Sequence, residues 1–231
     1  MQREISAQPP QFFVGHIPVY GDLILAPMDG VTDLPMRALA REMGSAISYT
    51  GFVNCQSVIA GDRRIDPVIA YLEAERPIAF QIFDDNPERM LEAALRLRER
   101  NPDLIDVNMG CSAKTVAGRG AGAGLLVEPK KIARIFHLLS QHLDIPVTGK
   151  IRLGWDEESL NYLEVAHIIE DNGGQMIAVH GRTKKQGYTG RADWEAIAEV
   201  KQAVKIPVIG NGDVTCVEEI EAIKSITGVD G

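Results

Sequence analysis

Short apolar runs alternate along the chain with longer stretches in which apolar and polar residues are mixed. Runs rich in Val, Ile and Leu that are bounded by polar residues are typical of buried strands. The mixed stretches place apolar residues at i, i+3, i+4 and i+7, which gives a helix one apolar face. The pattern therefore predicts strands that alternate with helices. The expected strands are Leu23–Met28, Ile47–Val53, Pro77–Phe83, Leu104–Met109, Pro146–Leu153, Met176–Arg182 and Ile206–Gly210.

Proline and glycine mark the ends of several expected helices. Asn86-Pro87 and Glu128-Pro129 predict helix starts, because proline is favoured at the first helical position. Asn172-Gly173-Gly174 predicts a helix end, and the last helix is expected to reach about Thr227. The residues with helical spacing form three sets: Met90, Ala93, Ala94 and Leu97; Ile132, Ile135, Phe136 and Leu139; and Tyr162, Val165, Ala166 and Ile169.

The order of these elements predicts an α/β fold. Strands that alternate with helices imply parallel pairing through right-handed crossovers. Seven such units fit a (β/α)8 TIM barrel better than a doubly wound sheet, whose G-x-G-x-x-G fingerprint the sequence lacks. Phe12–Val14 and Ile17–Val19 flank Gly15-His16 and predict a hairpin that closes the bottom of the barrel. Gly228–Gly231 resembles the approach to an eighth strand, so we expect a barrel over residues 1–231 that is truncated before or within strand 8.

Composition and charge narrow the classes of function. The 231 residues are 45% hydrophobic and 24% charged, as expected of one soluble α/β domain. The sequence shows neither a long apolar window nor a signal peptide, so we expect a cytoplasmic protein without a membrane partner. Cys55, Cys111 and Cys216 are widely spaced, which argues against a disulfide framework and a zinc site, and no metal is expected. The net charge of −8 argues against nonspecific binding of nucleic acid by the whole surface but allows a local basic face.

Polar residues gather where the expected strands end. In a TIM barrel the chemistry lies at the C-terminal ends of the strands. Polar groups that recur at one end of otherwise apolar strands are not explained by packing and indicate a site. Asp103 and Asp106 precede that end and are interpreted as structural. The candidate positions are Pro27, Met28, Asp29, Gln81, Asn108, Cys111, Lys150, Arg152, His180, Arg182, Asn211, Gly212 and Asp213.

Cys111 has two interpretations. A free cysteine is commonly a small buried apolar residue. However, Cys111 precedes a glycine-rich loop that carries Lys114 and Arg119, and cations on an accessible loop favour a reactive thiol. Cys55 and Cys216 lack such surroundings and are interpreted as structural.

Three other candidates also leave alternatives open. The ammonium group of Lys150 on a barrel strand needs an acceptor such as the pyrimidine edge of a flavin, unless the lysine forms a Schiff base. His180 could be either a core histidine or a site residue. Asn211-Gly212-Asp213 could be a simple turn, or it could present backbone N–H groups to a phosphate.

At these residues the sequence resembles the tRNA-dihydrouridine synthase family, bacterial type, over nearly its whole length. The motifs follow one another in the family's order and spacing, which makes the resemblance specific. The stretches that carry it are Leu25–Asp33, Gln81-Ile82-Phe83, Ile105–Cys111, Gly120-Ala121-Gly122, Lys150–Trp155, Val179–Thr183 and Ile209–Asp213.

The resemblance implies a bound FMN cofactor, NADPH as the reductant, and reduction of the C5–C6 bond of uridines in tRNA. Hydride from reduced FMN would reach C6 of uracil, and a proton from the general acid would quench the charge at C5. The target base would first have to turn out of its stack. By position, the catalytic acid is Cys111, the flavin is lined or contacted by Pro27, Met28, Asp29, Gln81, Lys150, His180, Asn211, Gly212 and Asp213, and the substrate base is touched by Asn108 and Arg182.

The resemblance also implies how tRNA would bind. Basic residues in the strand-to-helix loops would meet its phosphates: Lys114, Arg119, Lys184, Lys185 and Arg191. The alternative is that they are solvated loop charges. The family's C-terminal helical domain, which grips tRNA, is expected to lie outside this sequence, and a monomer is expected.

Three other functions compete with this one. Another FMN barrel of the dihydroorotate-dehydrogenase type would also act on a pyrimidine C5–C6 bond. A lyase or aldolase would use Lys150 as an imine former without a flavin. A catalytically silent fragment would only bind RNA or a partner.

Overall fold

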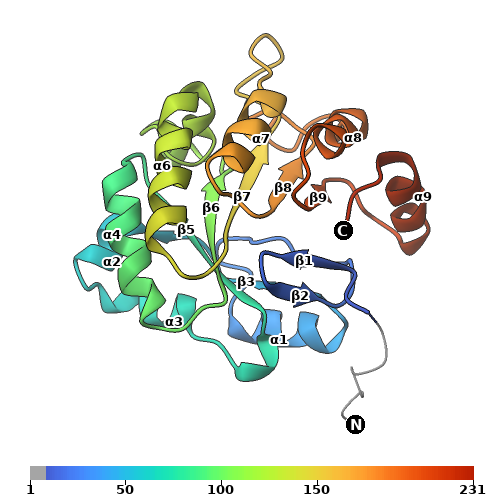
Figure 1. The fold of residues 1–231 in the computed structure, drawn as a ribbon. Coiled ribbons are helices and arrows are strands. Elements are labelled where there is room, and N and C mark those ends of the chain that lie inside the picture. The colour runs from blue at the N-terminus through green and yellow to red at the C-terminus, as the bar shows by residue number, and fades with distance from the viewer. Residues whose placement is uncertain (1–8) are drawn as a thin grey trace.

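A curled sheet of parallel strands, covered on its outside by helices, dominates the computed structural model, which describes residues 9–231 (Figure 1). The strands pair in the order β3-β5-β6-β7-β8-β9, and β4 also pairs with β5. Every one of these pairings is parallel, as the alternation of strands and helices predicted. The strands are β3 (Ser48–Tyr49), β4 (Val53–Asn54), β5 (Ile78–Phe83), β6 (Leu104–Met109), β7 (Val147–Arg152), β8 (Ile177–His180) and β9 (Val208–Asn211).

Two expected strands differ from the prediction. Leu23–Met28 is extended but forms no strand, so that prediction was wrong. The Leu23 carbonyl accepts the N–H of Ala46 at 2.8 Å, but the N–H of Leu25 donates to the Ser45 side chain at 3.0 Å and Pro27 has no N–H to offer, so no backbone ladder continues there. The expected strand Ile47–Val53 is divided into β3 and β4. Between them the Oγ1 of Thr50 accepts the N–H of Gln81 at 3.1 Å, so a side chain takes a place in the ladder.

The two edges of the sheet approach each other. Asp230 N–H donates to the carbonyl of Val208 at 3.0 Å, and Gly210 N–H donates to the carbonyl of Gly231 at 2.9 Å, so the last residues run beside β9 as the start of an eighth strand would. Gly231 also lies against Asp22, because a Cβ at Gly231 would be 2.6 Å from the Asp22 carbonyl oxygen. An ion pair between Lys224, on α9, and Asp22 lies beside this contact. The sheet is therefore curled into a TIM-barrel-like cylinder.

Helices form the outer layer of the cylinder (Figure 1). The predicted helix start at Asn86-Pro87 is confirmed, because the Asn86 side chain accepts the N–H of Arg89 at 2.8 Å and caps α4. Pro129 is the first residue of α6, as predicted. The helices are α1 (Leu34–Glu42), α2 (Cys55–Ile59), α3 (Asp66–Ile69), α4 (Pro87–Arg98), α5 (Lys114–Ala117), α6 (Pro129–His142), α7 (Tyr162–Asp171), α8 (Trp194–Ala203) and α9 (Val217–Thr227), with 3-10 turns at Arg63–Ile65, Glu73–Glu75 and Gly122–Val127.

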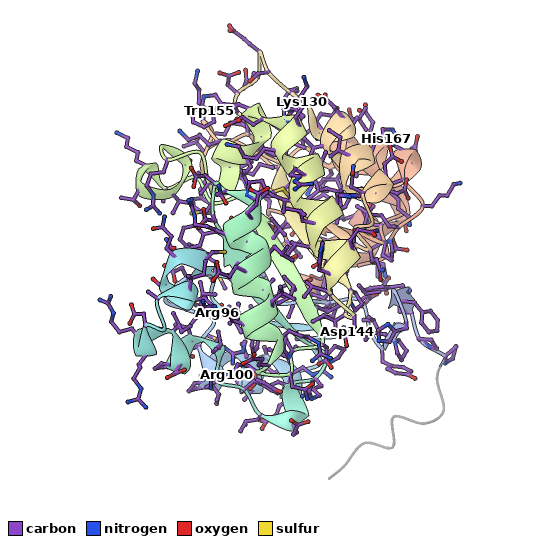
Figure 2. The ribbon with its side chains drawn as sticks, turned by 60° about the vertical axis from the view of Figure 1, so that its left-hand side comes forward. Arg96, Arg100, Lys130, Asp144, Trp155 and His167 are labelled. Carbon is purple, nitrogen blue, oxygen red and sulfur yellow. The ribbon has the colours of Figure 1, made fainter. Side chains whose placement is uncertain are left out.

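The apolar stripes of these helices form the main core against the outer face of the sheet. All four residues of the predicted sets on α4 and α6 are buried, and in the α7 set Val165, Ala166 and Ile169 are buried while Tyr162 packs at the edge. Figure 2 shows the opposite, polar faces of α4 and α6, with Trp155 and Lys130 at one end of the barrel and Asp144 and Arg100 at the other. None of the helices within residues 9–231 is both long enough and apolar enough to cross a membrane.

The predicted hairpin is confirmed. β1 (Phe12–Val14) pairs antiparallel with β2 (Ile17–Val19), and Phe12, Val14 and Val19 are buried. They pack against the N-terminal ends of the parallel strands, including Ala79 and Leu104. The hairpin therefore fills the bottom of the barrel with apolar side chains and leaves the other end for polar chemistry.

Candidate active site

The strands that form the barrel have one apolar and one polar face. Successive side chains of a strand point to opposite sides, so every second residue faces the barrel interior. On β6, Ile105, Val107 and Met109 join the core beneath the helices, whereas Asp106 and Asn108 bond to side chains of neighbouring strands. The same alternation continues on β7. The interior residues of this polar face are Asp106 and Thr148, deeper in the barrel, and, nearer the C-terminal ends of the strands, Gln81, Asn108, Lys150, Arg152, His180 and Asn211.

A chain of side-chain hydrogen bonds runs across β5, β6 and β7. Asp106 accepts from Gln81 Nε2 at 2.7 Å and from Thr148 Oγ1 at 2.5 Å. Asn108 Nδ2 donates to Gln81 Oε1 at 2.8 Å. Burial raises the pKa of Asp106 to about 6, although the bonds from Gln81 and Thr148 and the charge of Lys150 oppose that rise. Asp106, interpreted from the sequence as structural, thus bonds directly to the candidate flavin residue Gln81.

Asp103, in contrast, contacts only residues that hold the fold, as the sequence predicted. Its carboxylate accepts the N–H of Ile78 at 2.7 Å and pairs with Arg76 at 2.8 Å, at the opposite end of the strands from the polar mouth. These bonds fix the start of β5.

Lys150 and His180 lie on the other side of the mouth. Lys150 Nζ donates to Asn211 Oδ1 at 2.7 Å. Burial lowers the pKa of Lys150 to about 8, and the positive charge of Arg152 adds to this effect. Burial also lowers the pKa of His180 to about 3, helped by the charges of Lys150, Arg152 and Arg182. His180 is therefore a neutral imidazole near pH 7.

Two buried arginines hold the loop that follows β8. Arg152 donates to the carbonyl oxygens of Thr183 at 3.0 Å and Gly187 at 2.8 Å. Arg182 donates to the carbonyl oxygens of Thr189 at 3.1 Å and Gly190 at 2.7 Å, and pairs with Asp213 at 2.6 Å. These five partners of the two guanidinium groups are protein atoms, so the arginines fix the loop between residues 183 and 190.

The fixed loop presents an aromatic side chain at the mouth. Tyr188 is 82% exposed, and its ring centroid lies 6.2 Å from that of His180. The guanidinium carbon of Arg152 lies 5.6 Å from the Tyr188 ring centroid. An exposed aromatic residue held in this way can stack against a planar ligand.

Cys111 is half-buried just beyond β6. Its N–H donates to Asn108 Oδ1 at 2.9 Å, and its carbonyl accepts the N–H of Ala123 at 3.1 Å. Gly122 packs closely against it, because a Cβ there would come within 3.1 Å of Cys111 Cβ, and its φ of +54° also favours glycine. Among the other thiols, Cys55 is buried, which raises its pKa, and Cys216 is exposed at the start of α9.

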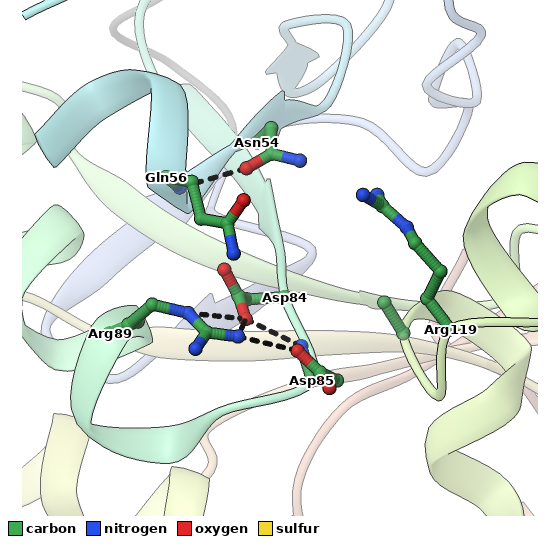
Figure 3. A pocket seen from close by; sticks show the side chains of 7 residues that line it. Asn54, Gln56, Asp84, Asp85, Arg89 and Arg119 are labelled. Atoms are coloured by element: carbon green, nitrogen blue, oxygen red, sulfur yellow. Dashed lines mark hydrogen bonds and ion pairs between the residues drawn. The ribbon is translucent and has the colours of Figure 1, made fainter. Parts of the chain in front are cut away.

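Two hollows open on the Cys111 side of the mouth and share Arg119. The larger, of about 570 Å³, has aromatic walls at Phe52 and Phe83, which also pack near Cys111. The smaller, of about 210 Å³, is polar (Figure 3). In it Arg89 pairs with Asp84 and Asp85, while Arg119 lies across the hollow from them. The remaining lining residues are Asp29, Ala113, Thr115 and Val116 in the larger hollow and Asn54, Gln56 and Ala121 in the smaller.

The loop after the first extended segment supplies the remaining candidates. Pro27 is half-buried, whereas Met28 and Asp29 are exposed. Thr32 Oγ1 accepts the N–H of Met28 at 3.1 Å, which closes this loop into a tight turn. A Cβ at Gly51 would lie 3.8 Å from Asp29 Oδ1, so Asp29 lies over the break between β3 and β4.

The basic loop residues are placed differently from one another. Lys114 and Arg119 are exposed on the Cys111 side, and Arg191 is exposed beyond the Tyr188 loop. Lys184 Nζ lies 4.1 Å from the ring centroid of Trp155, and Lys185 pairs with Asp156 at 2.7 Å.

Sequence reasoning missed several residues of this mouth. The inward alternation on β6 and β7 was the available signal for Asp106 and Thr148. Arg152 is among the candidate positions at the strand ends, without a predicted role. Phe52 and Tyr188 lie in loops, where neither periodicity nor a motif marked them.

The fold and the polar mouth define the class of the protein, a TIM-barrel-like α/β domain whose polar mouth lies at the C-terminal ends of the strands, the end that carries the active sites of such barrels. Among solved structures, the chain is similar to histamine dehydrogenase from Rhizobium sp. 4-9, with a TM-score of 0.68 and 11% identity over 95% of this chain and 44% of that one. It is also similar to the Amycolatopsis orientalis BexX/CysO complex, with a TM-score of 0.62 and 15% identity over 97% of this chain and 83% of that one. At such identities these likenesses show the fold alone.

The family follows from sequence comparison. The model of the dihydrouridine synthase (Dus) family matches residues 24–231, and the chain belongs to this family. It is 40% identical over 228 residues to probable tRNA-dihydrouridine synthase 1 of Synechocystis sp., covering 98% of this chain and 63% of that protein. It is 41% identical over 208 residues to tRNA-dihydrouridine synthase B of Pseudomonas aeruginosa, covering 90% of this chain and 63% of that protein. The chain thus spans a little less than two thirds of the length of these relatives.

Proposed function

We propose that this chain is the FMN-binding catalytic domain of a tRNA-dihydrouridine synthase. It reduces the C5–C6 double bond of uridine in tRNA to give 5,6-dihydrouridine, with NADPH as the reductant. The observation that carries the proposal is the convergence of Asn108, Lys150, His180 and Asn211 at one mouth of the barrel, with Cys111 at its rim. Family membership favours this function over the dihydroorotate-dehydrogenase and lyase alternatives.

The donors at the mouth fit a flavin. An ammonium group has three N–H donors, and within residues 9–231 Lys150 Nζ donates only to Asn211. The other two donors suit the carbonyl oxygens of a pyrimidine ring. With a pKa of about 8, Lys150 remains mostly protonated at pH 7 and can stabilise negative charge on that edge. Gln81 is fully buried with both ends of its amide bonded, so it supports this edge through Asn108 and Asp106.

Two further segments complete the cofactor site in this proposal. Pro27, Met28 and Asp29 line the flavin from the turn that follows the first extended segment. Asn211-Gly212-Asp213 has positive φ values at Gly212 and Asp213, a backbone shape that can turn N–H groups toward a phosphate. His180, being neutral, offers a hydrogen bond without adding charge.

The chemistry divides between the cofactor and the chain. FMN, when bound and reduced, supplies a hydride to C6 of uracil. Cys111 holds the proton that reaches C5, as a general acid. Asn108 keeps the backbone of Cys111 at the rim, and Arg152 Nε adds a bond to the carbonyl of Gly110 at 2.8 Å.

The larger hollow beside Cys111 suits the target base. Phe52 and Phe83 supply apolar walls for a flat ring, and Asp29, Thr115 and Arg119 supply polar groups at its edges. Turning the base out of its stack costs a few kcal/mol, which stacking on an exposed aromatic residue such as Tyr188 would offset in part. Arg182 acts on the substrate indirectly, through the loop that carries Tyr188.

In this proposal tRNA binds to basic residues in the loops around the barrel mouth, although the whole chain has a net charge of −8. Lys114, Arg119 and Arg191 are exposed there and can contact phosphates, whereas Lys184 and Lys185 are engaged with Trp155 and Asp156. We propose that the protein acts as a monomer in the cytoplasm.

Two measurements test the function. The purified chain should carry a yellow chromophore that absorbs at about 450 nm, as a bound flavin does. Incubated with NADPH, it should form dihydrouridine in tRNA that lacks this modification, and it should not turn over free dihydroorotate. A colourless protein that cannot be loaded with FMN would overturn the proposal, and turnover of dihydroorotate alone would assign it to the other class of FMN barrel.

A further inference from the structure

A continuous row of hydrogen bonds connects the carboxylate of Asp106, deep in the barrel, to the backbone of Cys111 at its rim. Gln81 Nε2 donates to Asp106 Oδ2 at 2.7 Å, and Asn108 Nδ2 donates to Gln81 Oε1 at 2.8 Å. Asn108 Oδ1 then accepts the N–H of Cys111 at 2.9 Å and that of Gly110 at 3.2 Å. Asp106, Gln81 and Asn108 are all buried, so water does not compete for these bonds.

The carboxylate at the start of the row fixes the direction of every later bond. An ionised carboxylate only accepts hydrogen bonds, so Gln81 must turn its amide nitrogen toward Asp106 and its oxygen toward Asn108. Asn108 must therefore present its nitrogen to Gln81 and its oxygen to Cys111. Reversal of either amide would place two donors or two acceptors face to face in a buried site, which is costly.

The inner end of the row is itself held in place. Thr148 Oγ1 donates to the second carboxylate oxygen of Asp106 at 2.5 Å, and Thr148 lies opposite Asp106 in the pairing of β6 with β7. Both oxygens of Asp106 thus have partners on neighbouring strands. Its side chain cannot rotate without breaking a bond to β5 or to β7.

The outer end of the row controls a segment that has no regular structure. Gly110–Ala113 lies between β6 and α5, outside any strand or helix, and the N–H of Cys111 bonds to Asn108 in place of a backbone partner. We propose that Asp106 is a positioning residue for Cys111: its carboxylate sets the donor direction of Gln81 and Asn108 and thereby holds the thiol at the barrel mouth. The effect on uridine reduction rests on the proposed function, but the positioning of the thiol can be measured without tRNA.

An exchange of the two inner groups tests this directly. Gln81→Glu places two carboxylates face to face, so their repulsion breaks the bond between positions 81 and 106 and draws the side chain at position 81 away from Asn108. Adding Asp106→Asn restores the row, because the amide at position 106 then donates to the carboxylate at position 81, which still accepts from Asn108. The amide oxygen at position 106 still accepts from Thr148. The double exchange therefore keeps the bonds to Thr148 and to Asn108, and the total charge is unchanged. Asp106→Asn alone should have a smaller effect than Gln81→Glu, because its amide can still accept from Gln81 and donate to Thr148 Oγ1.

The first readout is the rate at which iodoacetamide alkylates Cys111, followed peptide by peptide with mass spectrometry. Cys216 is exposed at the start of α9, apart from the row, and provides an internal control in the same sample. We expect Gln81→Glu to change the Cys111 rate about fivefold or more relative to Cys216, and the double exchange to return it to within about twofold. Glu88→Gln, on the exposed face of α4, controls for loss of a carboxylate and should leave the ratio unchanged.

The second readout is uridine reduction, measured as kcat with the KM for tRNA determined separately. Gln81→Glu should lower kcat about tenfold with a much smaller change in KM, and the double exchange should recover most of it. Equal defects in the single and double variants, in alkylation and in kcat, would overturn the proposal. If alkylation follows the expected pattern but no protein, including the wild type, reduces uridine, the positioning stands and the proposed function fails.

A neutral variant covers the case in which Gln81→Glu does not fold. Gln81→Met removes both bonds of the row without adding a charge, and it should change the alkylation of Cys111 in a way that Asp106→Asn does not. An unchanged Cys111 rate in a folded Gln81→Met protein, judged by its thermal transition, would contradict the role given to the row.

Discussion

The two halves of the barrel mouth are built from different kinds of bond. Across β5, β6 and β7, Gln81, Asp106 and Asn108 bond to one another, so side chains hold side chains. Across β7, β8 and β9, Arg152 and Arg182 donate mainly to carbonyl oxygens of the following loop. The first half ends at two neighbouring backbone N–H groups, those of Gly110 and Cys111, whereas the second fixes a whole loop.

This difference indicates which changes each half can tolerate. A row of amides carries a direction, so its function depends on which atom donates, and a substitution of nearly equal shape can disrupt it. The arginine half depends on charge and on several bonds made by one group, so its loss leaves several carbonyl oxygens of the loop without a donor. The first half should therefore govern the reactivity of one thiol, and the second should govern stability and ligand contact.

The largest effect on stability is expected from Arg182→Met. It leaves Asp213 unpaired and removes donors from the carbonyl oxygens of Thr189 and Gly190, which should lower the free energy of unfolding by about 2 kcal/mol. Urea denaturation followed by circular dichroism measures this loss. Arg119→Met, at an exposed arginine, is the matched control and should change the free energy by less than about 0.5 kcal/mol. Equal losses in the two variants would show that the bonds of Arg182 to the loop do not stabilise the fold.

Lys150→Met should weaken FMN binding roughly 30-fold. It removes a charged donor, worth about 2 kcal/mol, from the edge where we place the pyrimidine ring. Quenching of flavin fluorescence during titration measures the dissociation constant. Lys130→Met, on the outer face of α6 in Figure 2, should bind FMN as the wild type does. Wild-type affinity in Lys150→Met would place the flavin elsewhere.

The neutral state of His180 should appear in the dependence of stability on pH. Its pKa is lowered to about 3 in the folded protein, from 6.5 in the unfolded one, so the folded state binds fewer protons between these values. The unfolding free energy must then fall as the pH falls below 6.5, by about 2 kcal/mol from this group between pH 8 and pH 5. Urea denaturation at both pH values should show a smaller fall in His180→Gln. An identical fall would mean that His180 titrates normally in the folded protein.

Tyr188→Leu should have the smallest of these effects. Loss of one stacking platform for a base should raise the KM for tRNA about tenfold, equivalent to about 1.4 kcal/mol, with the dissociation constant of FMN little changed. Tyr188→Phe keeps the ring and should restore the KM. If Tyr188→Phe is as defective as Tyr188→Leu, the hydroxyl group and not the ring is responsible.

The regular part of the fold could be predicted from the sequence because local patterns determine it. The bounds of β6 were predicted correctly from its apolar run, and α4 begins at Asn86-Pro87 because both its cap and its proline are local signals. The extended segment Leu23–Met28 could not be distinguished from a strand, since its apolar pattern is that of a strand. Its backbone bonds go to Ser45 and Ala46, which only the tertiary structure brings beside it.

The candidate site could be predicted in position but not in its internal connections. Residues at strand ends were placed at one mouth by the regular geometry of parallel strands, as Lys150 and Asn211 show. The bond from Asp106 to Gln81 joins residues 25 positions apart and depends on the register of β5 with β6, which no local pattern gives. The orientation of Tyr188 depends on two arginines from other strands, for the same reason.

In the proposed function, a flavin at this mouth works with Cys111 as the acid. The most direct test mixes the FMN-loaded, reduced protein with unmodified tRNA in the absence of oxygen and follows the reoxidation of the flavin. We expect Cys111→Ala to bind as much FMN as the wild type and to be reoxidised by tRNA at least about 100-fold more slowly, because proton transfer to C5 is lost. Reoxidation of Cys111→Ala at the rate of the wild type would contradict the role of Cys111 as the general acid.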